Sequence, residues 1–409
     1  MPPLRPLLLF LLGLAAMPLC CLAQPAPARS AGAAYTSAAA LQDRGLYDLA
    51  AKEWLAMLRA HPEDPLASRA RYNLGVCRFQ QGDFSAAAKE FQAAATGKYA
   101  ESVAAAAWAN LGLARFNLAS SLPPEQQPAA SEGYRQAVAA FDRLLKEFPQ
   151  SSQVATSHYY RGESLAALGE TAEAAKSFSA VLTDPNASAL HEASRISLAR
   201  AELESGEPAK AEATLNSLLA ATPAGAPLSE AYLLRGEARL AAGNPQAAAE
   251  DFAKAAADAD PAAMDSVLER HAFALYTGKD YANASDLYAR LANRYPDSPL
   301  AADARVACAK CLMLSGLDRQ AERAFAKLWN AAPTADNAEA AHWLVQTLLK
   351  RGKHEEAAQL ARQALATSPP PQWRAPLQLA LADGLSEQPD GQREALQLFT
   401  RYAREHAGA

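Results

Sequence analysis

Apolar positions along this chain follow a helical spacing that restarts at a nearly constant interval. Ten times an alanine stands four residues before a second apolar residue, which is bulky in nine of the ten pairs. Successive pairs lie 36–38 residues apart except for one interval of 50, and they are Ala50/Trp54, Ala87/Phe91, Ala137/Phe141, Ala174/Phe178, Ala211/Leu215, Ala248/Phe252, Ala284/Tyr288, Ala321/Phe325, Ala357/Ala361 and Ala395/Phe399. A fixed period near 35 residues predicts an α-helical solenoid.

Residues 155–185 show what one unit predicts. Apolar or small residues at spacings of three and four form one face of a first helix, at Tyr159, Gly162, Leu165 and Ala166. Gly169 ends that helix, since glycine readily takes a left-handed conformation, and Pro185 stops a second helix that carries Phe178 on its apolar face. Six other units have a glycine at the same place, at Gly45, Gly82, Gly206, Gly243, Gly316 and Gly352. Neither helix can bury its face alone, so each pair must stack on the next.

These residues resemble the tetratricopeptide repeat family, whose pattern is a Trp, then Leu-Gly, Tyr, Ala, Phe, Ala and a closing Pro. The third unit matches it at Trp108, Leu111, Gly112, Ala137, Phe141 and Pro149. The resemblance covers about residues 35–406 and implies an all-α fold, a right-handed α-solenoid of about nine to ten stacked antiparallel helix pairs. Loops such as the one at Phe148–Ser152 look like those of bacterial cell-envelope members, the outer-membrane assembly lipoprotein and the Tol-Pal-associated protein.

The N-terminal residues read as a targeting segment. Arg5 supplies a positive flank, Leu7–Ala16 an apolar stretch, and Cys21-Leu22-Ala23 a small-residue cleavage site, so residues 1–23 are predicted to be a signal peptide. We therefore expect secretion across the inner membrane to the periplasm. Lipid anchoring through Cys20 or Cys21, or a retained N-terminal anchor, are the alternatives, and the protein meets the membrane only in those cases.

The mature chain is predicted to have three parts. Residues 24–34, rich in Pro and Ala, form a short flexible leader, and residues 35–409 form the solenoid. An insertion at 119–132 lies between the two helices of the third unit, lengthens their turn and can extend either helix. The last helix, about 392–406, is expected to close the array with three side chains turned inward, Leu396, Phe399 and Tyr402.

Chemical signals are weak, and we predict no enzyme, cofactor or metal. The net charge of −5 argues against a nucleic-acid partner, which calls for a basic surface. The seven histidines show no metal-ligand spacing. Cys308 and Cys311 have the spacing of a redox pair but lie within a helix with no strand before it, so packing between helices is the favoured interpretation, with redox use as the alternative.

In this family the first helix of each pair lines the concave surface where partners bind. Carried over by position, the candidate groove residues are Tyr72, Val76, Phe79, Leu113, Phe116, Tyr159 and Glu163. Packing between repeats is the competing interpretation for each of them. The aromatic side chains favour an apolar partner, and Glu163 together with Glu230 and Glu237 favours a basic one.

The predicted function is therefore a non-catalytic interaction scaffold of the bacterial cell envelope that binds a protein or peptide in its groove. One alternative is a redox or enzyme accessory that uses the cysteine pair. Another is a self-associating structural component of a secretion or pilus-assembly machine. The sequence leaves the oligomeric state open.

Overall fold

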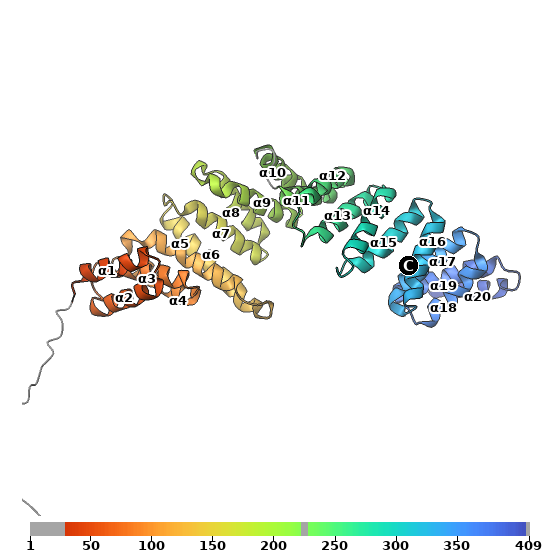
Figure 1. The fold of residues 1–409 in the computed structure, drawn as a ribbon, viewed down its shortest axis with the longest axis horizontal. Helices are drawn as coiled ribbons and strands as arrows, with labels where there is room; N and C mark the ends of the chain where they lie inside the picture. Colours follow the sequence, from red (N-terminus) through yellow and green to blue (C-terminus); the bar gives the residue numbers. More distant parts are fainter. Residues whose placement is uncertain (1–28, 222–227, 406–409) are drawn as a thin grey trace, which may run out of the picture. The chain divides into compact units, whose positions relative to one another are not determined.

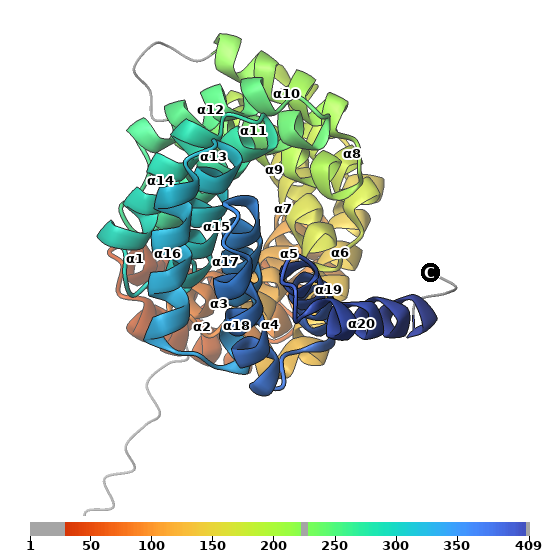
Figure 2. The ribbon, with the colours of Figure 1, turned by 90° about the vertical axis from the view of Figure 1, so that its right-hand side faces the viewer.

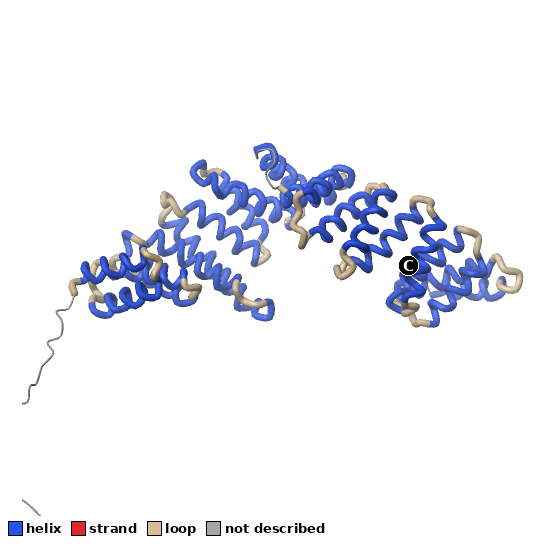
Figure 3. The backbone as a smooth tube through the Cα atoms, in the orientation of Figure 1, coloured by secondary structure: helices blue, strands red, loops and turns tan. Residues whose placement is uncertain are grey.

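The structure is a computed structural model that describes residues 29–221 and 228–405. All regular elements in these residues are helices, as Figures 1 and 3 show. The predicted all-α solenoid of stacked helix pairs is thereby confirmed. The predicted signal peptide and residues 24–28 of the predicted leader lie outside the described residues.

The chain divides into two compact units, Met1–Ala114 and Arg115–Ala409, and the division falls inside helix α5. In unit 1, consecutive helices pack against each other around a core that contains Trp54 and Leu74. The described elements of unit 1 are α1 (Ala31–Asp43), α2 (Tyr47–Ala60), α3 (Ala67–Gln80), α4 (Phe84–Thr96), η1 (Ala100–Ser102) and the first part of α5 (Ala104–Ser120).

Unit 2 continues the same sequential packing, and its first helices also contact the first helices of neighbouring pairs, as in α7 with α9 and α15 with α17. After the remainder of α5, its described elements are η2 (Pro124–Gln126), α6 (Gln127–Glu147), α7 (Val154–Ala167), α8 (Thr171–Leu182), η3 (Pro185–Ala187), α9 (Ser188–Glu204), α10 (Pro208–Ala221), α11 (Ser229–Ala241), α12 (Pro245–Ala257), α13 (Met264–Thr277), α14 (Tyr281–Arg294), α15 (Ala301–Leu314), α16 (Asp318–Ala331), η4 (Ala335–Asn337), α17 (Ala338–Lys350), α18 (His354–Ala366), α19 (Pro371–Ser386) and α20 (Gln392–Glu405).

The repeating apolar pairs form the core of each unit. Both residues of the first nine pairs are buried, and the second helix of each pair carries them. The alanine lets two helix backbones approach closely, while the larger residue one turn later fills the space beside them. The tenth pair differs because Ala395 is buried but Phe399 is only half-buried.

The turn between the two helices of a unit requires a left-handed residue. All seven glycines that keep the period have φ between 72° and 79°. In the unit of Ala284 the same place is held by Lys279, whose φ is 66°. A residue with a Cβ is strained in this region.

Replacing Lys279 by glycine is therefore expected to stabilise the protein. Glycine removes the strain of the left-handed conformation, and it also makes the unfolded chain more flexible, which costs stability. The first effect is larger, so the free energy of unfolding should rise by about 0.5–1 kcal/mol. Chemical denaturation followed by circular dichroism measures it. Gly243→Ala places a Cβ at the matching turn, where φ is 79°, and should lower the denaturation midpoint. A lower midpoint for Lys279→Gly would show that this lysine is not strained.

The insertion at 119–132 is divided between two long helices and a short turn. α5 reaches Ser120 and α6 begins at Gln127, so these helices have 17 and 21 residues. Their extended ends contact each other: the Tyr134 hydroxyl donates to Ser120 Oγ at 3.2 Å, and the Tyr134 ring lies 5.7 Å from that of Phe116. The extra residues thus build a longer helical hairpin.

Two end positions differ from the sequence-based boundaries. Helix α1 begins at Ala31, within the stretch predicted as leader, because the Ser30 side chain caps it by accepting from the Ala33 amide at 3.3 Å. In α20, Leu396 is 67% exposed, so the expectation that it faces inward is wrong. Ala395 is the residue of α20 that is buried in the core, and Leu398 and Phe399 pack against that core.

Candidate functional site

The first helices of the pairs form the inner side of unit 2. In Figure 2, α7, α9, α11, α13 and α15 lie on the inside of the curve that this unit follows, and α8, α10, α12, α14 and α16 lie outside. The second helices carry the buried alanine pairs of the core. A molecule that contacts this inner side would therefore meet residues of the first helices.

The candidate groove residues are divided between the two units, and those of unit 1 are partly buried within the fold. The Tyr72 hydroxyl accepts from Asn110 Nδ2 at 3.0 Å, and its ring lies 5.7 Å from that of Phe91. Burial raises the Tyr72 pKa, partly offset by the hydrogen bond from Asn110. Phe79 packs edge-on against Phe84 at 5.1 Å. The other two candidates of this unit, Val76 and Leu113, are half-buried.

In unit 2 the candidates Phe116, Tyr159 and Glu163 also have partners within the fold. The Phe116 ring lies 5.4 Å from Tyr160, and the Tyr159 ring lies 5.2 Å from Tyr160. Glu163 accepts a hydrogen bond from Ser197 Oγ at 2.6 Å, which joins α7 to α9. All seven candidates are therefore at least partly used for packing or for links between neighbouring repeats.

Two of the three acidic side chains that favoured a basic partner, Glu230 and Glu237, are paired with arginines of neighbouring repeats. Arg200 Nη2 donates to Glu230 at 2.5 Å, and Arg270 forms an ion pair with Glu237. With Glu163 bound to Ser197, none of the three carboxylates projects as an isolated negative charge. The geometry gives no support to a basic partner.

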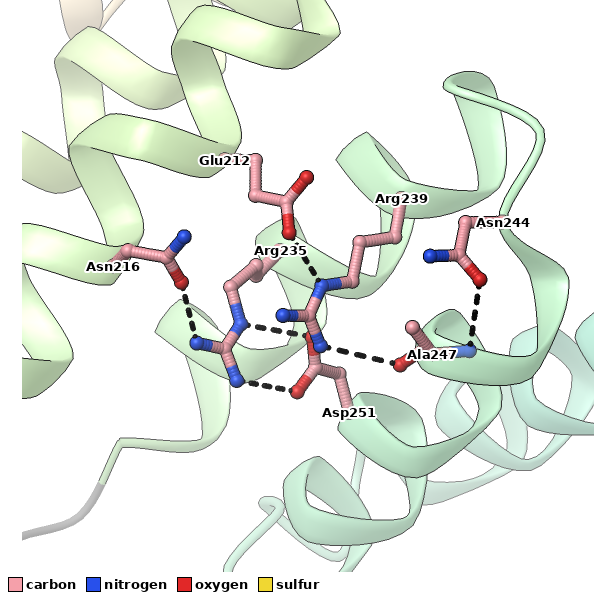
Figure 4. Close-up of polar contacts among 7 residues, drawn as sticks. All are labelled: Glu212, Asn216, Arg235, Arg239, Asn244, Ala247 and Asp251. Atoms are coloured by element: carbon pink, nitrogen blue, oxygen red, sulfur yellow. Dashed lines mark hydrogen bonds and ion pairs between the residues drawn. The ribbon is translucent and has the colours of Figure 1, made fainter.

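The densest polar cluster of unit 2 is structural (Figure 4). Asp251 on α12 is fully buried and accepts two hydrogen bonds from Arg235, at 2.7 and 2.9 Å, and one from Arg239 at 2.9 Å. The two arginines on α11 also reach back to α10, where Arg235 binds Asn216 at 2.7 Å and Arg239 binds Glu212 at 2.8 Å. The cluster ties three consecutive helices together, and both carboxylate oxygens of Asp251 accept hydrogen bonds.

The cysteines give the redox alternative no support. Cys77, Cys308 and Cys311 are all reduced, and Cys77 and Cys311 are buried. Burial raises the pKa of Cys308, that of Cys77 to about 11 and that of Cys311 to about 12. The thiolate is the nucleophile, and a raised pKa keeps a thiol predominantly protonated at neutral pH. In residues 29–221 and 228–405, no three His, Cys, Asp or Glu side chains are grouped so that they could hold a metal ion.

A pocket between α15 and α17 is the feature that the sequence-based site prediction missed. It has a volume of about 370 Å³ and is lined by Met313, Leu314, His342, Trp343, Gln346 and Lys350. Leu314 is 43% exposed there although it is a large apolar residue. The sequence offered one sign of this pocket, a histidine and a tryptophan together on a first helix.

His342 anchors the back of this pocket. It is 9% exposed and lies against the rings of Trp343 and Trp373, at 5.0 and 5.4 Å. Its Nδ1 is buried without a hydrogen-bond partner. Burial lowers the His342 pKa, and Lys310 lowers it further against an opposing effect of Glu339. The His342 ring is therefore neutral at pH 7 and adds an aromatic, uncharged surface to the pocket.

Acidification is expected to destabilise the fold through its buried histidines. Burial lowers the pKa of His158, His271 and His342. Each folded-state pKa lies below the unfolded value of about 6.5, so the unfolded chain takes up protons first. The stabilisation is complete above about pH 6.5 and is lost as pH falls through that value toward the folded-state pKa values.

Urea midpoints measured between pH 7.5 and 5.5 test this expectation. The midpoint should fall with pH, and His271→Gln should flatten the decline because one titrating group is removed. The buried carboxyls Glu202 and Glu269 have raised pKa values and act in the opposite direction, at lower pH. A midpoint that is constant over this range would contradict the assignment of these histidines as buried neutral groups.

Comparisons with known proteins agree with the repeat architecture. Sequence profiles described as tetratricopeptide repeat match residues 35–102, 129–189, 196–263, 266–298 and 338–363, which together make up more than half of the chain. No curated protein gives a significant sequence match. Within the described residues, the helices are too short or too polar to cross a membrane.

Comparison with solved structures finds partial similarities at low sequence identity. The C-terminal part of a TPR repeat-containing protein from Cytophaga hutchinsonii is 17% identical, with a TM-score of 0.48, over 66% of this chain and 98% of that one. PilW, a type IV pilus biogenesis factor, is 18% identical with a TM-score of 0.38, over 56% and 94%. A chain in the structure of Naa15/Naa10 bound to HypK-THB is 14% identical, with a TM-score of 0.41, over 93% of this chain and 64% of that one. The profile matches and the stacked helix pairs show that this chain belongs to the tetratricopeptide repeat family.

Proposed function

We propose that this protein is a non-catalytic scaffold of the bacterial cell envelope that binds a protein or peptide partner on the inner side of its first helices. The observation that carries the proposal is the exposure of large apolar side chains on first helices of unit 2. Phe273 on α13 is 45% exposed and Leu314 on α15 is 43% exposed. Exposed aromatic and aliphatic side chains on a concave repeat surface are the kind of anchors that dominate protein interfaces.

Site-specific crosslinking in the native host tests this function. A photo-crosslinking amino acid in place of Phe273 should capture a discrete protein partner that mass spectrometry identifies. The matched control is Ala282, an exposed residue on α14 of the same helix pair, on the outer side. Capture at both positions or at neither would overturn the assignment of the inner face as the binding surface.

The envelope location rests on the N-terminal sequence alone. We expect the mature protein to begin at Gln24, because the order of charged, apolar and small residues in 1–23 is that of a cleaved signal peptide. N-terminal sequencing of protein from the periplasmic fraction measures this. An intact Met1, or a lipid on Cys20 or Cys21, would contradict soluble secretion.

A further inference from the structure

The first described helix, α1, exposes positions that are buried in the later first helices. Ala33 and Ala40 are both exposed. Their matching positions in α3, α5, α7, α9, α11, α13, α15 and α17 are all buried: Ala70, Ala107, Ser157, Ser194, Ala231, Val267, Ala304 and Ala340 match Ala33, and Cys77, Ala114, Ser164, Ala201, Ala238, Ala274, Cys311 and Thr347 match Ala40. Cys77 shows what covers this surface, since its Sγ donates to Gln42 Oε1 of the preceding pair at 3.4 Å.

A polar position on the same side of α1 shows the same difference. Thr36 is exposed, and its hydroxyl donates to the Gly32 carbonyl of its own helix at 2.9 Å. In four later units the matching side chain binds a residue of the preceding first helix instead, as Asn73 binds Tyr35, Asn110 binds Tyr72, Ser197 binds Glu163 and Arg270 binds Glu237. Ala33, Thr36 and Ala40, which we call the α1 face, therefore form a repeat-packing surface that is uncovered in the described residues.

The last helix, α20, exposes a repeat-packing position as well. Leu396 follows Ala395 directly and is 67% exposed, more than any other large apolar side chain in residues 29–221 and 228–405. The matching residues of the other second helices are buried or half-buried, and they are Ala51, Ala88, Val138, Ala175, Glu212, Ala249, Ser285, Glu322 and Ala358. Leu396 is thus uncovered at a place where the other second helices are covered.

The junction between α16 and α18 shows what Leu396 would meet in a following repeat. Glu322 has the register position of Leu396, and it pairs with Lys353 at 3.1 Å. Lys353, four residues before Ala357, has the register position of Leu46, four residues before Ala50. Leu46 is 43% exposed. Two exposed leucines therefore stand at the two positions that come together at this junction.

The junction between α10 and α11 adds a third leucine to this contact. Glu212 also has the register position of Leu396, and it pairs with Arg239 at 2.8 Å. Arg239 matches Leu41 of α1, which is half-buried and packs against the core of unit 1. Charged residues inside the chain are thus matched by leucines at both ends of the described residues.

We infer that a second copy of this chain docks head-to-tail, with α20 of one copy packing on α1 and α2 of the next through Leu396, Leu46 and the α1 face. The contact continues the register in which repeats stack within the chain, and the large Leu396 side chain packs beside small residues. It joins unit 2 of one copy to unit 1 of another and is independent of the proposed inner-face binding. Because the two surfaces differ, each copy keeps one of each free, so the association continues unless a ring closes.

Sedimentation velocity of the mature protein tests this contact. The sedimentation coefficient should rise with protein concentration, and Leu396→Glu and Leu46→Lys should each keep the protein monomeric, because a charge then enters an apolar contact. Both leucines are exposed, so the melting temperature of each variant should stay that of the natural chain. Leu317→Lys is the matched control: Leu317 is the N-cap of α16, has the register position of Leu46 and is also 43% exposed, and its replacement should leave the association unchanged.

Mixing the two variants distinguishes a head-to-tail contact from a symmetric one. The Leu396→Glu copy keeps Leu46, and the Leu46→Lys copy keeps Leu396. The mixture should therefore form a complex that neither variant forms alone. If the copies met through the α1 face on both sides, Leu396→Glu alone would still associate, which would overturn the head-to-tail contact.

The dependence on salt gives a second readout. Gln81 Nε2 donates to Asp48 at 2.7 Å, and these two residues match Arg44 and Arg393 in register. The two arginines therefore come near each other at the contact between copies. Added salt screens their repulsion, so the association should strengthen as ionic strength rises. Association that weakens with salt would show that ion pairs, not leucines, hold the copies together.

The inference is also overturned if the natural chain stays monomeric at every concentration, if the mixed variants stay monomeric, or if Leu317→Lys abolishes association. None of these results bears on the scaffold function, because crosslinking at Phe273 tests the inner face separately.

Discussion

Replacing Asp251 by alanine is expected to destabilise unit 2 by about 3–5 kcal/mol, because the change leaves buried positive charge without its counterion. The Asp251 side chain is fully buried, whereas those of Arg235 and Arg239 are 12% and 18% exposed. Both guanidinium groups lose their hydrogen bonds to the carboxylate and cannot turn to open water without breaking the contacts to α10. The cost is that of an uncompensated buried charge, which exceeds the value of a typical surface ion pair.

Guanidinium denaturation of the mature protein, followed by circular dichroism, measures this effect. Asp251→Asn should also destabilise strongly, because it keeps the shape but removes the charge. Glu173→Ala is the matched control: Glu173 forms an exposed ion pair with Lys176 on α8, and its loss should leave the midpoint unchanged within error. If Asp251→Ala shifts the midpoint no more than Glu173→Ala, the cluster in Figure 4 does not hold α10, α11 and α12 together.

Hydrogen exchange shows which helices of the Asp251→Ala variant lose stability. In a repeat protein each pair contacts only its neighbours, so the weakened contacts should appear as faster exchange in α10–α12 while unit 1 keeps its protection. Uniformly faster exchange across both units would show that the array unfolds as a single cooperative block instead.

The sequence predicts the fold well because the repeat is a local pattern with a steric cause. Ala174 and Phe178 fall one helical turn apart, and Gly169 stands where the chain must turn with a positive φ. Each of these requirements involves residues close in sequence. The division of the insertion at 119–132 between α5, α6 and their turn could not be predicted in the same way, because it depends on contacts such as that between Tyr134 and Ser120.

The site is less predictable because it depends on partners one repeat away. The position of Tyr72 indicates that it lies on a first helix, but whether it faces a ligand depends on Asn110, 38 residues later. Tyr35 and Asn73 have the same spacing and the same 3.0 Å hydrogen bond. This recurring pair shows that a register comparison between adjacent units would have identified Tyr72 as a link between repeats. The same comparison distinguishes Leu46 and Leu317 from the polar N-cap residues Asp83, Asn244 and Asp280 of other units.

In the pairs that contain an aromatic residue, this residue is expected to contribute most to the core, and Phe178 shows why. Its side chain is fully buried beneath Tyr159, and its ring occupies the space that the missing side chain of Gly162 leaves open. Phe178→Ala is expected to cost about 3–5 kcal/mol, from lost burial and from the cavity that remains. An added Cβ at Gly162 would lie 2.6–2.8 Å from three ring atoms of Phe178, so Gly162→Ala alone should cost about 1–3 kcal/mol by overpacking.

The double variant Gly162→Ala/Phe178→Ala tests whether the glycine is required by the phenylalanine ring. When Phe178 is already alanine, Gly162→Ala meets no ring and should stabilise the helix by up to about 1 kcal/mol, since alanine is the better helix former. The same substitution therefore changes sign with its background, which a double-mutant cycle of denaturation midpoints resolves. Gly32→Ala is the matched control, because a Cβ there contacts nothing within 4 Å and should not destabilise the protein. Additive effects of Gly162→Ala and Phe178→Ala would show that the glycine is not required by the ring, and that close packing of this pair is not what sets the repeat.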